Sequence, residues 1–371
     1  CLVGSEMCIR DRAPDAPAGI TDLSKEVTRM AEDAQVAGIN LGDAALASRT
    51  RMGMQSVEDL MYSSLDNGHA MPTLTASYLA KAGGKRFRPL MVLLAAQVVQ
   101  AENNPNWMTD ELETNVIRSG SVIEMIHLAS LYHDDVMDEA LQRRGTESAN
   151  SRWGNSVAIL AGDYLFAAAS AIMSDMGTQA VRWISETFAE LVNGQMEETV
   201  HAGSMESVEA YLRVIHGKTA SLIATAGHFG AYYAGGTEEQ VAALKKAAHA
   251  TGMAFQIVDD VIDISSNSTQ SGKTPGTDLR EGVFTLPVLY ALEEDSHAGD
   301  RLREILTGSV TDEELVKEAL TLLRGSAGMR QARETIYAYR DEAKDALSIF
   351  RDSSAKDAFF HLVDFTVARV S

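Results

Sequence analysis

The feature that most restricts the fold of this chain is a scarcity of proline combined with helical spacing of apolar residues along almost its whole length. Only 7 prolines occur among 371 residues, and a proline inside a helix removes a hydrogen bond and clashes with the preceding turn. We find no run of alternating strand character. Capping-box spacings at Thr237 with Gln240 and at Thr311 with Glu314 predict two helix starts. We therefore expect an all-α protein.

The predicted organisation is one large domain preceded by a short arm. Residues 1–12 contain both cysteines, Cys1 and Cys8, and resemble the read-through of a cloning adapter, so we expect a non-native segment. Residues 13–45 are rich in Ala, Asp and Gly and predict a mobile arm. Because no linker rich in Pro, Gly or Ser divides residues 46–371, we interpret them as a single domain.

Charge and apolar content exclude several classes of function. Lys and Arg number 32 and Asp and Glu number 52, which gives a formal charge of −20. A surface this negative repels phosphate backbones and anionic lipids, so we expect no nucleic-acid partner. The longest apolar stretch, residues 157–173, is interrupted by Asp163 and predicts a buried helix rather than a transmembrane segment. Because we also find no secretory signal, we expect a cytoplasmic protein.

Two aspartate triplets of identical spacing are the strongest functional signal. They comprise Asp134, Asp135 and Asp138, and Asp259, Asp260 and Asp263. On a helix, the first and last members of each triplet lie one above the other. Both triplets sit among apolar residues, where uncompensated carboxylates are costly, so we interpret them as cation ligands rather than as a solvated acidic face. Oxygen ligands without His or Cys beside them favour Mg²⁺ or Mn²⁺.

Positive charge is scarce in this chain and gathers in four short segments. They are Lys85-Arg86-Phe87-Arg88, Arg143-Arg144, Lys218-Thr219, and the glycine-rich loop around Lys273. Arginine forks suit diphosphate oxygens, whereas lysine supplies a point charge. His127 precedes Asp134 by seven residues, and Gln256 precedes Asp259 by three, so each shares a helix face with its triplet.

In this order the motifs resemble the trans-isoprenyl diphosphate synthases, also called the polyprenyl synthetase family, and in particular its medium- and long-chain members. The resemblance runs from about Met54 to the C-terminus. It implies a single-domain, isoprenoid-synthase-like helical bundle around a deep central cavity, active as a homodimer. It also implies that isopentenyl diphosphate condenses with a geranyl, farnesyl or geranylgeranyl diphosphate, giving a longer all-trans polyprenyl diphosphate and diphosphate. Two or three Mg²⁺ ions would assist this reaction.

The resemblance assigns a role to each motif residue. Those expected to hold the diphosphate of isopentenyl diphosphate are Lys85, Arg88, His127 and Arg144. Those expected to hold Mg²⁺ are Asp134, Asp135, Asp138, Asp259, Asp260 and Asp263. Those expected to contact the allylic diphosphate are Arg143, Lys218 and Lys273. Thr219 and Gln256 should lie beside the reacting carbon. The expected catalytic set is Asp134, Asp135, Asp138, Lys218, Thr219, Gln256, Asp259 and Asp260.

Three positions bear on product length or affinity. Bulky aromatic residues just before the first triplet stop chain growth early in this family, whereas this chain has the small residues Ala129 and Ser130. The resemblance therefore implies longer products. The chain departs from the family at Val283, where many members have a lysine. One cationic contact to the allylic diphosphate is then missing, or Arg280 replaces it.

Three alternative functions share part of this pattern. A class I terpene cyclase also has an aspartate-rich triplet on an all-α fold, but it normally lacks the second triplet and the Gly-Lys-Arg motif. A non-catalytic or partner subunit of a heteromeric prenyltransferase loses the aspartates and the basic motif, and this chain keeps both. A plain acidic metal-binding or scaffold protein would leave the ordered cations unexplained.

Overall fold

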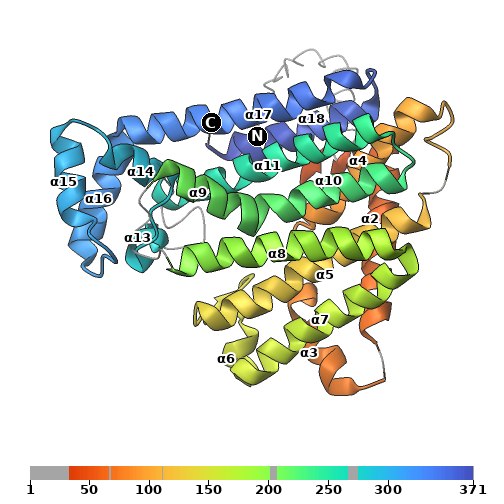
Figure 1. The fold of residues 1–371 in the computed structure, drawn as a ribbon, viewed down its shortest axis with the longest axis horizontal. Coiled ribbons are helices and arrows are strands. Elements are labelled where there is room, and N and C mark those ends of the chain that lie inside the picture. The colour runs from red at the N-terminus through yellow and green to blue at the C-terminus, as the bar shows by residue number, and fades with distance from the viewer. Residues whose placement is uncertain (1–32, 67, 111, 201–206, 266–274, 371) are drawn as a thin grey trace, which may run out of the picture.

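The chain folds almost entirely into helices. The computed structural model describes residues 33–66, 68–110, 112–200, 207–265 and 275–370. Within these ranges the only strands are two pairs of two residues each, so the all-α prediction is confirmed (Figure 1). The predicted adapter segment, residues 13–32 of the predicted arm, and Lys273 lie outside the described residues.

The elements of the first half are β1 (Gln35–Val36), β2 (Ile39–Asn40), α2 (Ala44–Leu65), α3 (Ala70–Lys81), α4 (Phe87–Asn103), α5 (Thr114–Met137), β3 (Gln142–Arg143), β4 (Thr146–Glu147), α6 (Ala149–Trp153), α7 (Asn155–Met176) and α8 (Thr178–Val200). Those of the second half are α9 (Val208–Ile215), the π-helical turn η1 (His216–Ala220), α10 (Ser221–Tyr233), α11 (Glu238–Ser265), α13 (Thr277–Glu281), α14 (Leu286–Leu292), α15 (His297–Ile305), α16 (Glu313–Gly325), α17 (Ala327–Ala346), η2 (Leu347–Ile349), α18 (Ser354–Val367) and η3 (Ala368–Val370).

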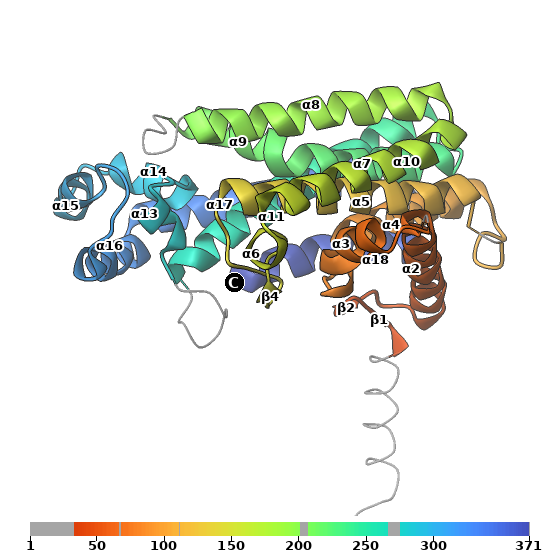
Figure 2. The ribbon, with the colours of Figure 1, turned by 90° about the horizontal axis from the view of Figure 1, so that it is seen from below.

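The long helices pack as layers around a shared core. α5 packs against α7, α10 packs against both α4 and α11, and α11 packs against α17. Seen from below, α8 lies on one side of the layer that contains α5 and α7, and α2, α3 and α18 lie on the other (Figure 2). α11 is long enough to join two apolar clusters, with Leu244 in the larger and Val258 in the smaller. The smaller cluster holds the short helices α13 to α16 at one end of the molecule.

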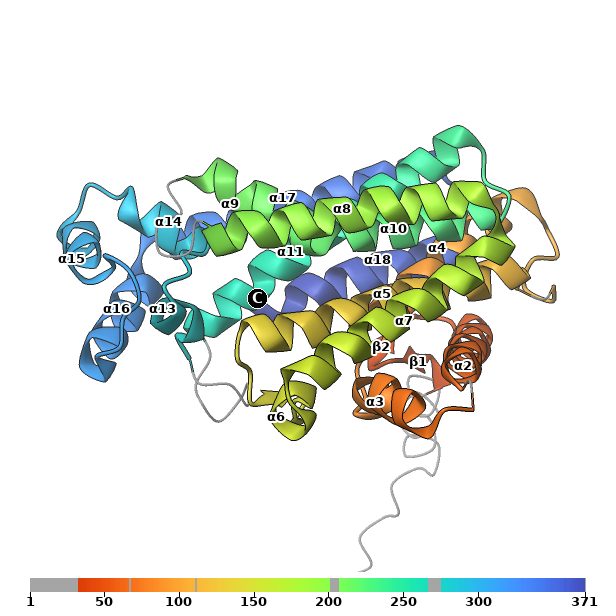
Figure 3. The ribbon, with the colours of Figure 1, turned by 60° about the horizontal axis from the view of Figure 1, so that its bottom comes forward.

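The directions of α5 and α11 bring the two aspartate triplets to the same end of the bundle. The first triplet occupies the last turn and C-cap of α5, and the second lies in the last two turns of α11. Both helices end on the side of α9 and α13 (Figures 1 and 3). Residues 125 positions apart in the sequence, Asp134 and Asp259, therefore belong to one region of the fold.

Neither strand pair was predicted from the sequence, and one of them bears on function. The β3–β4 hairpin turns at Arg144 and Gly145, which have φ angles of 55° and 73°. Positive φ at both central residues is typical of a tight turn that matches the twist of its strands. Two-residue strands are too short to give an alternating pattern, so only the turn carries a sequence signal.

The two predicted helix starts have different outcomes. The capping box at Thr237 is confirmed, because Gln240 N donates to Thr237 Oγ1 at 3.2 Å and Thr237 N donates to Gln240 Oε1 at 3.0 Å. The prediction at Thr311 is wrong by one residue. Asp312 is the N-cap of α16 and accepts from Glu314 N at 2.8 Å, since Asp caps a helix at least as well as Thr.

Two segments extend further than the sequence predicted. Leu41 is fully buried ahead of the predicted domain start at residue 46, although the division into domains stays a prediction. α7 has 22 residues and is long and apolar enough to cross a membrane by length and composition alone. It packs against α5, α3 and α8, as the apolar core helix of a bundle does, and it still exposes Leu160 at 65%.

Candidate active site

A hollow of about 550 Å³ lies where the two triplets meet, and we call it the aspartate pocket. It is lined by Met137, Asp138, Arg143, Gln195, Glu198, Thr199, Tyr211, Val214, Ile215, Lys218, Thr219, Gln256, Asp260, Asp278, Glu281, Val283 and Thr285. Each aspartate triplet contributes one of these residues, Asp138 and Asp260. The structure therefore brings both triplets and four of the predicted polar partners, Arg143, Lys218, Thr219 and Gln256, to one site.

The first triplet divides its carboxylates between the pocket and the protein interior. Asp138 lines the pocket, and burial raises the pKa of neighbouring Asp134 to about 6, with Lys218 opposing the shift. Asp135 is fully buried, and its Oδ1 accepts from Arg143 Nε at 2.6 Å. Its Oδ2 has no hydrogen-bond partner among the described residues. The structure thus places Asp135 behind Arg143 and not in the pocket lining.

In the second triplet, Asp260 ends a chain of hydrogen bonds. Thr219 Oγ1 donates to Gln256 Oε1 at 2.9 Å, and Gln256 Nε2 donates to Asp260 Oδ1 at 3.0 Å. The Tyr211 hydroxyl donates to the other oxygen of Asp260. Burial raises the pKa of Asp260 to about 7. The amide of Gln256 is therefore held in one orientation, with Thr219 beside it.

The other two carboxylates of the second triplet contact segments that are distant in sequence. Asp259 Oδ1 accepts from Arg369 Nη1 of η3 at 2.7 Å. Asp263 accepts from the backbone N–H groups of Thr277 at 3.2 Å and Asp278 at 3.3 Å, at the start of α13. Asp259 is thus occupied by a cation of this chain, and Asp263 ties α13 to the end of α11.

Negative charge dominates the aspartate pocket. Burial raises the pKa of Glu281, and Asp138 of the first triplet and Asp263 of the second raise it further. Among the described residues, no group of three His, Cys, Asp or Glu side chains could hold a metal ion by itself. Carboxylates without sufficient counter-charge fit divalent cations whose coordination is completed by an anionic ligand, which is how Mg²⁺ commonly binds.

The π-helical turn η1 explains why Lys218 and Thr219 reach this pocket. It interrupts the helix formed by α9 and α10 where α8 crosses closely. A Cβ on Gly194 would lie 2.6 Å from Lys218 N, and one on Gly217 would lie 2.7 Å from Glu190 O, so both positions require glycine. π-turns of this kind are frequent at functional sites. Lys218 Nζ donates to Glu198 Oε2 at 2.5 Å.

A second charged region adjoins the pocket, and we call its members Arg86, Arg88, His127 and Arg144 the basic cluster. The Nε atom of Arg88 is buried without a hydrogen-bond partner among the described residues, and burial lowers the pKa of Arg88 to about 10. Burial also lowers the pKa of His127 well below 6.5, and Arg88 and Arg144 lower it further. An anion placed here would satisfy groups that the protein leaves short of negative charge. Lys85 is exposed, with Nζ 5.1 Å from the centre of the Phe365 ring.

The β3–β4 hairpin joins the two regions. Arg143 lines the aspartate pocket, whereas Arg144 Nη1 donates to Leu79 O at 3.0 Å and Gly83 O at 2.5 Å in the basic cluster. The guanidinium of Arg144 lies against Gly84, where a Cβ would come within 3.0 Å of Cζ and φ is +137°. The glycine before Lys85 is therefore required by close approach as well as by its backbone.

Several predicted positions lie outside the pocket lining. Arg280, the alternative cation for Val283, donates from Nε and Nη2 to Glu313 at 2.9 and 2.8 Å. Ala129 is buried where α5 meets α7, with its carbonyl oxygen 3.1 Å from a Cβ built on Gly162. Ser130 Oγ donates to His127 O at 2.8 Å. The roles of these positions stay predictions.

The fold also brings to the two regions residues that were not predicted from the sequence. They are Glu124, Gln195, Glu198, Tyr211 and Arg369. Gly194 is the signal that could have found Gln195 and Glu198, because an isolated glycine inside a helical pattern indicates a close approach. The remaining three donate to or accept from side chains 38 or more positions away, at Arg86, Asp260 and Asp259, and carry no local signal.

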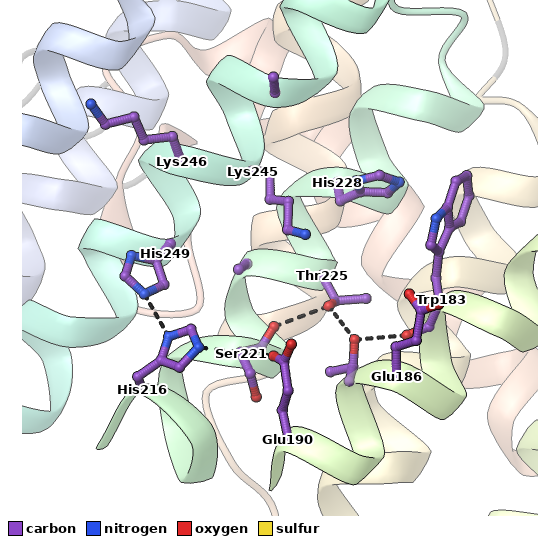
Figure 4. Close-up of a pocket in the computed structure, with 13 residues that line it drawn as sticks. Trp183, Glu186, Glu190, His216, Ser221, Thr225, His228, Lys245, Lys246 and His249 are labelled. Carbon is purple, nitrogen blue, oxygen red and sulfur yellow. Dashed lines mark hydrogen bonds and ion pairs between the residues drawn. The ribbon is translucent and has the colours of Figure 1, made fainter. Parts of the chain in front are cut away.

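A second hollow, of about 390 Å³, lies among α8, η1, α10 and α11 and shares no lining residue with the aspartate pocket (Figure 4). His216 Nδ1 lies 2.8 Å from His249 Nε2 across it. Burial lowers the pKa of His228, another lining residue, to about 4. Neither triplet contributes to this hollow, so it stands apart from the site described above.

An all-α bundle that holds a carboxylate pocket beside a buried basic cluster defines a class of protein suited to binding diphosphates with the help of divalent cations. Comparison with known proteins identifies the family. The family model described as polyprenyl synthetase matches residues 71–323. The chain therefore belongs to the polyprenyl synthetase family and is an enzyme of the prenyltransferase class.

Individual relatives agree with this assignment. The chain is 49% identical over 335 residues to a nonaprenyl diphosphate synthase of Mycobacterium tuberculosis, which covers 90% of this chain and 97% of the relative. A structure of geranylgeranyl pyrophosphate synthase from Corynebacterium glutamicum, complexed with calcium and isoprenyl diphosphate, is 48% identical with a TM-score of 0.78 and covers 89% of this chain and 98% of that one. A decaprenyl diphosphate synthase from Rhodobacter capsulatus is 32% identical with a TM-score of 0.79, at 88% and 98% coverage.

Proposed function

We propose that the protein elongates prenyl chains by condensing isopentenyl diphosphate with a geranyl, farnesyl or geranylgeranyl diphosphate. The products are a longer all-trans polyprenyl diphosphate and free diphosphate. The observation that carries the proposal is the adjacency of the aspartate pocket and the basic cluster, joined by Arg143 and Arg144. Two diphosphates can then be held side by side, one through divalent cations and one directly.

The aspartate pocket is assigned to the allylic diphosphate. Its carboxylates would hold two or three Mg²⁺ ions (or Mn²⁺), which neutralise the diphosphate as it leaves. Lys218 and Arg143 line the same pocket and supply direct cationic contacts. The oriented oxygens of Gln256 and Thr219 present negative dipoles to the cationic carbon that forms when the allylic C–O bond breaks.

The basic cluster is assigned to the diphosphate of isopentenyl diphosphate. Arg88, His127 and Arg144 are half-buried there, and Lys85 is exposed at the edge of the cluster. Binding in this cluster holds the alkene of isopentenyl diphosphate close to the allylic carbon. A new C–C bond forms, and the proton lost from the isopentenyl unit is accepted by the released diphosphate, so the reaction requires no histidine or glutamate as a base.

A product assay tests this function. Purified protein is incubated with Mg²⁺, isopentenyl diphosphate and farnesyl diphosphate, and diphosphate release and prenyl products are measured. We expect stoichiometric diphosphate release together with lengthened linear products. A cyclic hydrocarbon formed without isopentenyl diphosphate would indicate a terpene cyclase. Activity that appears only after a second protein is added would indicate a subunit of a heteromeric enzyme.

Product length is proposed to depend on Ala129 and Ser130. Both are small and lie about one turn before Asp134; Ala129 is buried and Ser130 is half-buried. We expect Ala129→Phe to shorten the main product by at least one isoprene unit, because the larger ring would block the path of the growing chain. Mass spectrometry of the products measures this, with Ala167→Phe on the exposed face of α7 as the control. An unchanged product distribution would contradict the assignment.

We also propose that the active form is a cytoplasmic homodimer. α8 exposes a row of small and apolar residues at helical spacing: Val181, Ser185, Ala189, Val192, Met196 and Val200. Rows of this kind mark interaction surfaces, and identical chains most often pair with two-fold symmetry. Light scattering should give twice the chain mass, and Val192→Asp together with Met196→Glu should reduce it to that of a monomer. A wild-type monomer at micromolar concentration would contradict the proposal.

A further inference from the structure

Glu124 is an almost fully buried carboxylate that none of the motifs includes. It lies on α5, three residues before His127, and only 2% of its surface is exposed. It does not line the aspartate pocket. A buried carboxylate is stable only when it is paired, so its partners reveal its role.

The partners of Glu124 come from two separate segments of the basic cluster. Its Oε1 accepts from Arg86 Nη1 at 3.1 Å and lies 3.7 Å from Arg144 Nη2. Arg86 belongs to the entry of α4, and Arg144 belongs to the β3–β4 turn. One carboxylate oxygen therefore fastens the loop before α4 to the hairpin.

Glu124 also offsets the mutual repulsion of the arginines. It provides the largest favourable charge contribution to the pKa values of Arg86, Arg88 and Arg144. The other carboxylate in this neighbourhood, Glu58, binds Arg86 Nε at 2.8 Å and is 34% exposed. Arg88 is left with an Nε that has no partner among the described residues, and Arg144 Nη2 lies 3.7 Å from Glu124 Oε1, farther than a hydrogen bond. Glu124 thus holds the cations together without neutralising all of them.

We infer that Glu124 is a positioning residue for the isopentenyl diphosphate half of the reaction, fixing Arg86 and Arg144 so that Arg88 and Arg144 together receive the diphosphate. The inference rests on the proposed function, because it assumes that the basic cluster binds this substrate. Glu124 touches neither substrate. Its effect should therefore appear in the affinity for one substrate and not in the chemistry.

Steady-state kinetics of Glu124→Gln with both substrates varied tests the inference. The substitution keeps the shape of the side chain and removes its charge. We expect the KM for isopentenyl diphosphate to rise by about tenfold to a hundredfold, the range of a lost charge-assisted contact. The KM for farnesyl diphosphate, the Mg²⁺ dependence and kcat should stay within about threefold of wild type. Glu124→Asp retains the charge and should show a smaller rise.

Glu58→Gln is the matched control, because it removes the other carboxylate from Arg86 without touching Arg144. It should leave the KM for isopentenyl diphosphate within about threefold. If Glu124→Gln does not fold, Glu124→Asp provides the test. It must then raise the KM for isopentenyl diphosphate and leave the KM for farnesyl diphosphate unchanged. Equal rises of both KM values, or no rise, would overturn the inference.

Arg88→Ala separates this inference from the proposed function. If Arg88→Ala raises the KM for isopentenyl diphosphate and Glu124→Gln does not, the role of Glu124 is wrong and the substrate site stands. If neither variant affects this KM, the assignment of the basic cluster fails, and the inference fails with it.

Discussion

The aspartate pocket and the basic cluster are neighbours with opposite deficits of charge. In the two triplets at the pocket, burial raises the pKa of Asp134 to about 6 and that of Asp260 to about 7. In the cluster, burial lowers the pKa of Arg88 to about 10 and that of His127 well below 6.5. Each region holds its charged groups with too little counter-charge. The aspartate pocket is therefore suited to a cationic ligand, and the basic cluster is suited to an anionic ligand.

This contrast explains how a chain with a net charge of −20 can bind two anionic substrates. One diphosphate needs divalent cations between itself and the carboxylates, whereas the other meets arginines directly. The two hairpin residues divide between these modes of diphosphate binding. Arg143 lines the aspartate pocket, and Arg144 belongs to the basic cluster. Variants on either side should consequently affect different substrates.

The largest effect is expected from removing carboxylates of the two aspartate triplets. Asp134→Asn and Asp259→Asn should each lower kcat by about a thousandfold, because the leaving diphosphate would lose charge stabilisation. Binding of isopentenyl diphosphate, measured by calorimetry without metal, should be unchanged. Asp59→Asn on the exposed face of α2 is the control. Near-normal turnover of the Asp134, Asp259 double variant would show that the carboxylates do not bind the cations that the allylic diphosphate needs.

Arg88→Ala should give the next largest effect, on the other side of the contrast. Its buried guanidinium has an Nε without a partner among the described residues. We expect the KM for isopentenyl diphosphate to rise about a hundredfold, with the half-saturating Mg²⁺ concentration unchanged. Arg118→Ala, which removes an arginine from the same helix as His127, should have no such effect. A parallel loss of Mg²⁺ affinity would show that the basic cluster and the aspartate pocket do not bind their ligands independently.

A histidine titration sharpens the contrast further. Because the pKa of His127 lies below 6.5 in the folded chain, the unfolded chain binds more protons below pH 6.5, and the free energy of unfolding falls as the pH drops. Isopentenyl diphosphate should raise the pKa of His127 and lessen this fall. NMR of the ring resonances measures the change, with His228 of the second hollow, at a pKa of about 4, as the control. Equal shifts of both histidines would show that the effect is not local.

The smallest effect is expected at Arg369, which pairs with Asp259. Both side chains are about one-third exposed, at 36% and 37%, and such pairs contribute little. Because Arg369 must release Asp259 before a cation binds there, Arg369→Gln should lower the half-saturating Mg²⁺ concentration by about twofold to fivefold. A higher Mg²⁺ requirement would show that Arg369 assists the metal site and does not compete with it.

The sequence predicted the parts of this site that have a local pattern. The two triplets and Gln256 were recognisable from helical spacing, and the structure gathers Asp138, Asp260 and Gln256 around one pocket. The all-α fold followed from the same periodicity. These predictions succeed because a helix face is set by residues three, four and seven positions apart.

The parts without a local pattern could not be predicted. The bond from Tyr211 to Asp260 spans 49 positions, and the bond from Arg86 to Glu124 spans 38. Asp135 has the same spacing to its triplet as Asp260, yet it does not line the pocket and is bonded to Arg143. Which member of a triplet faces the pocket depends on tertiary packing, which spacing alone does not encode.

Metal-dependent binding of the two substrates tests the central claim most directly. Calorimetry would compare isopentenyl diphosphate with an unreactive farnesyl thiodiphosphate, each with Mg²⁺ and with EDTA. We predict that EDTA abolishes binding of the farnesyl analogue and leaves the affinity for isopentenyl diphosphate within about threefold. Loss of both affinities in EDTA, or retention of both, would contradict the division of labour between carboxylates and arginines.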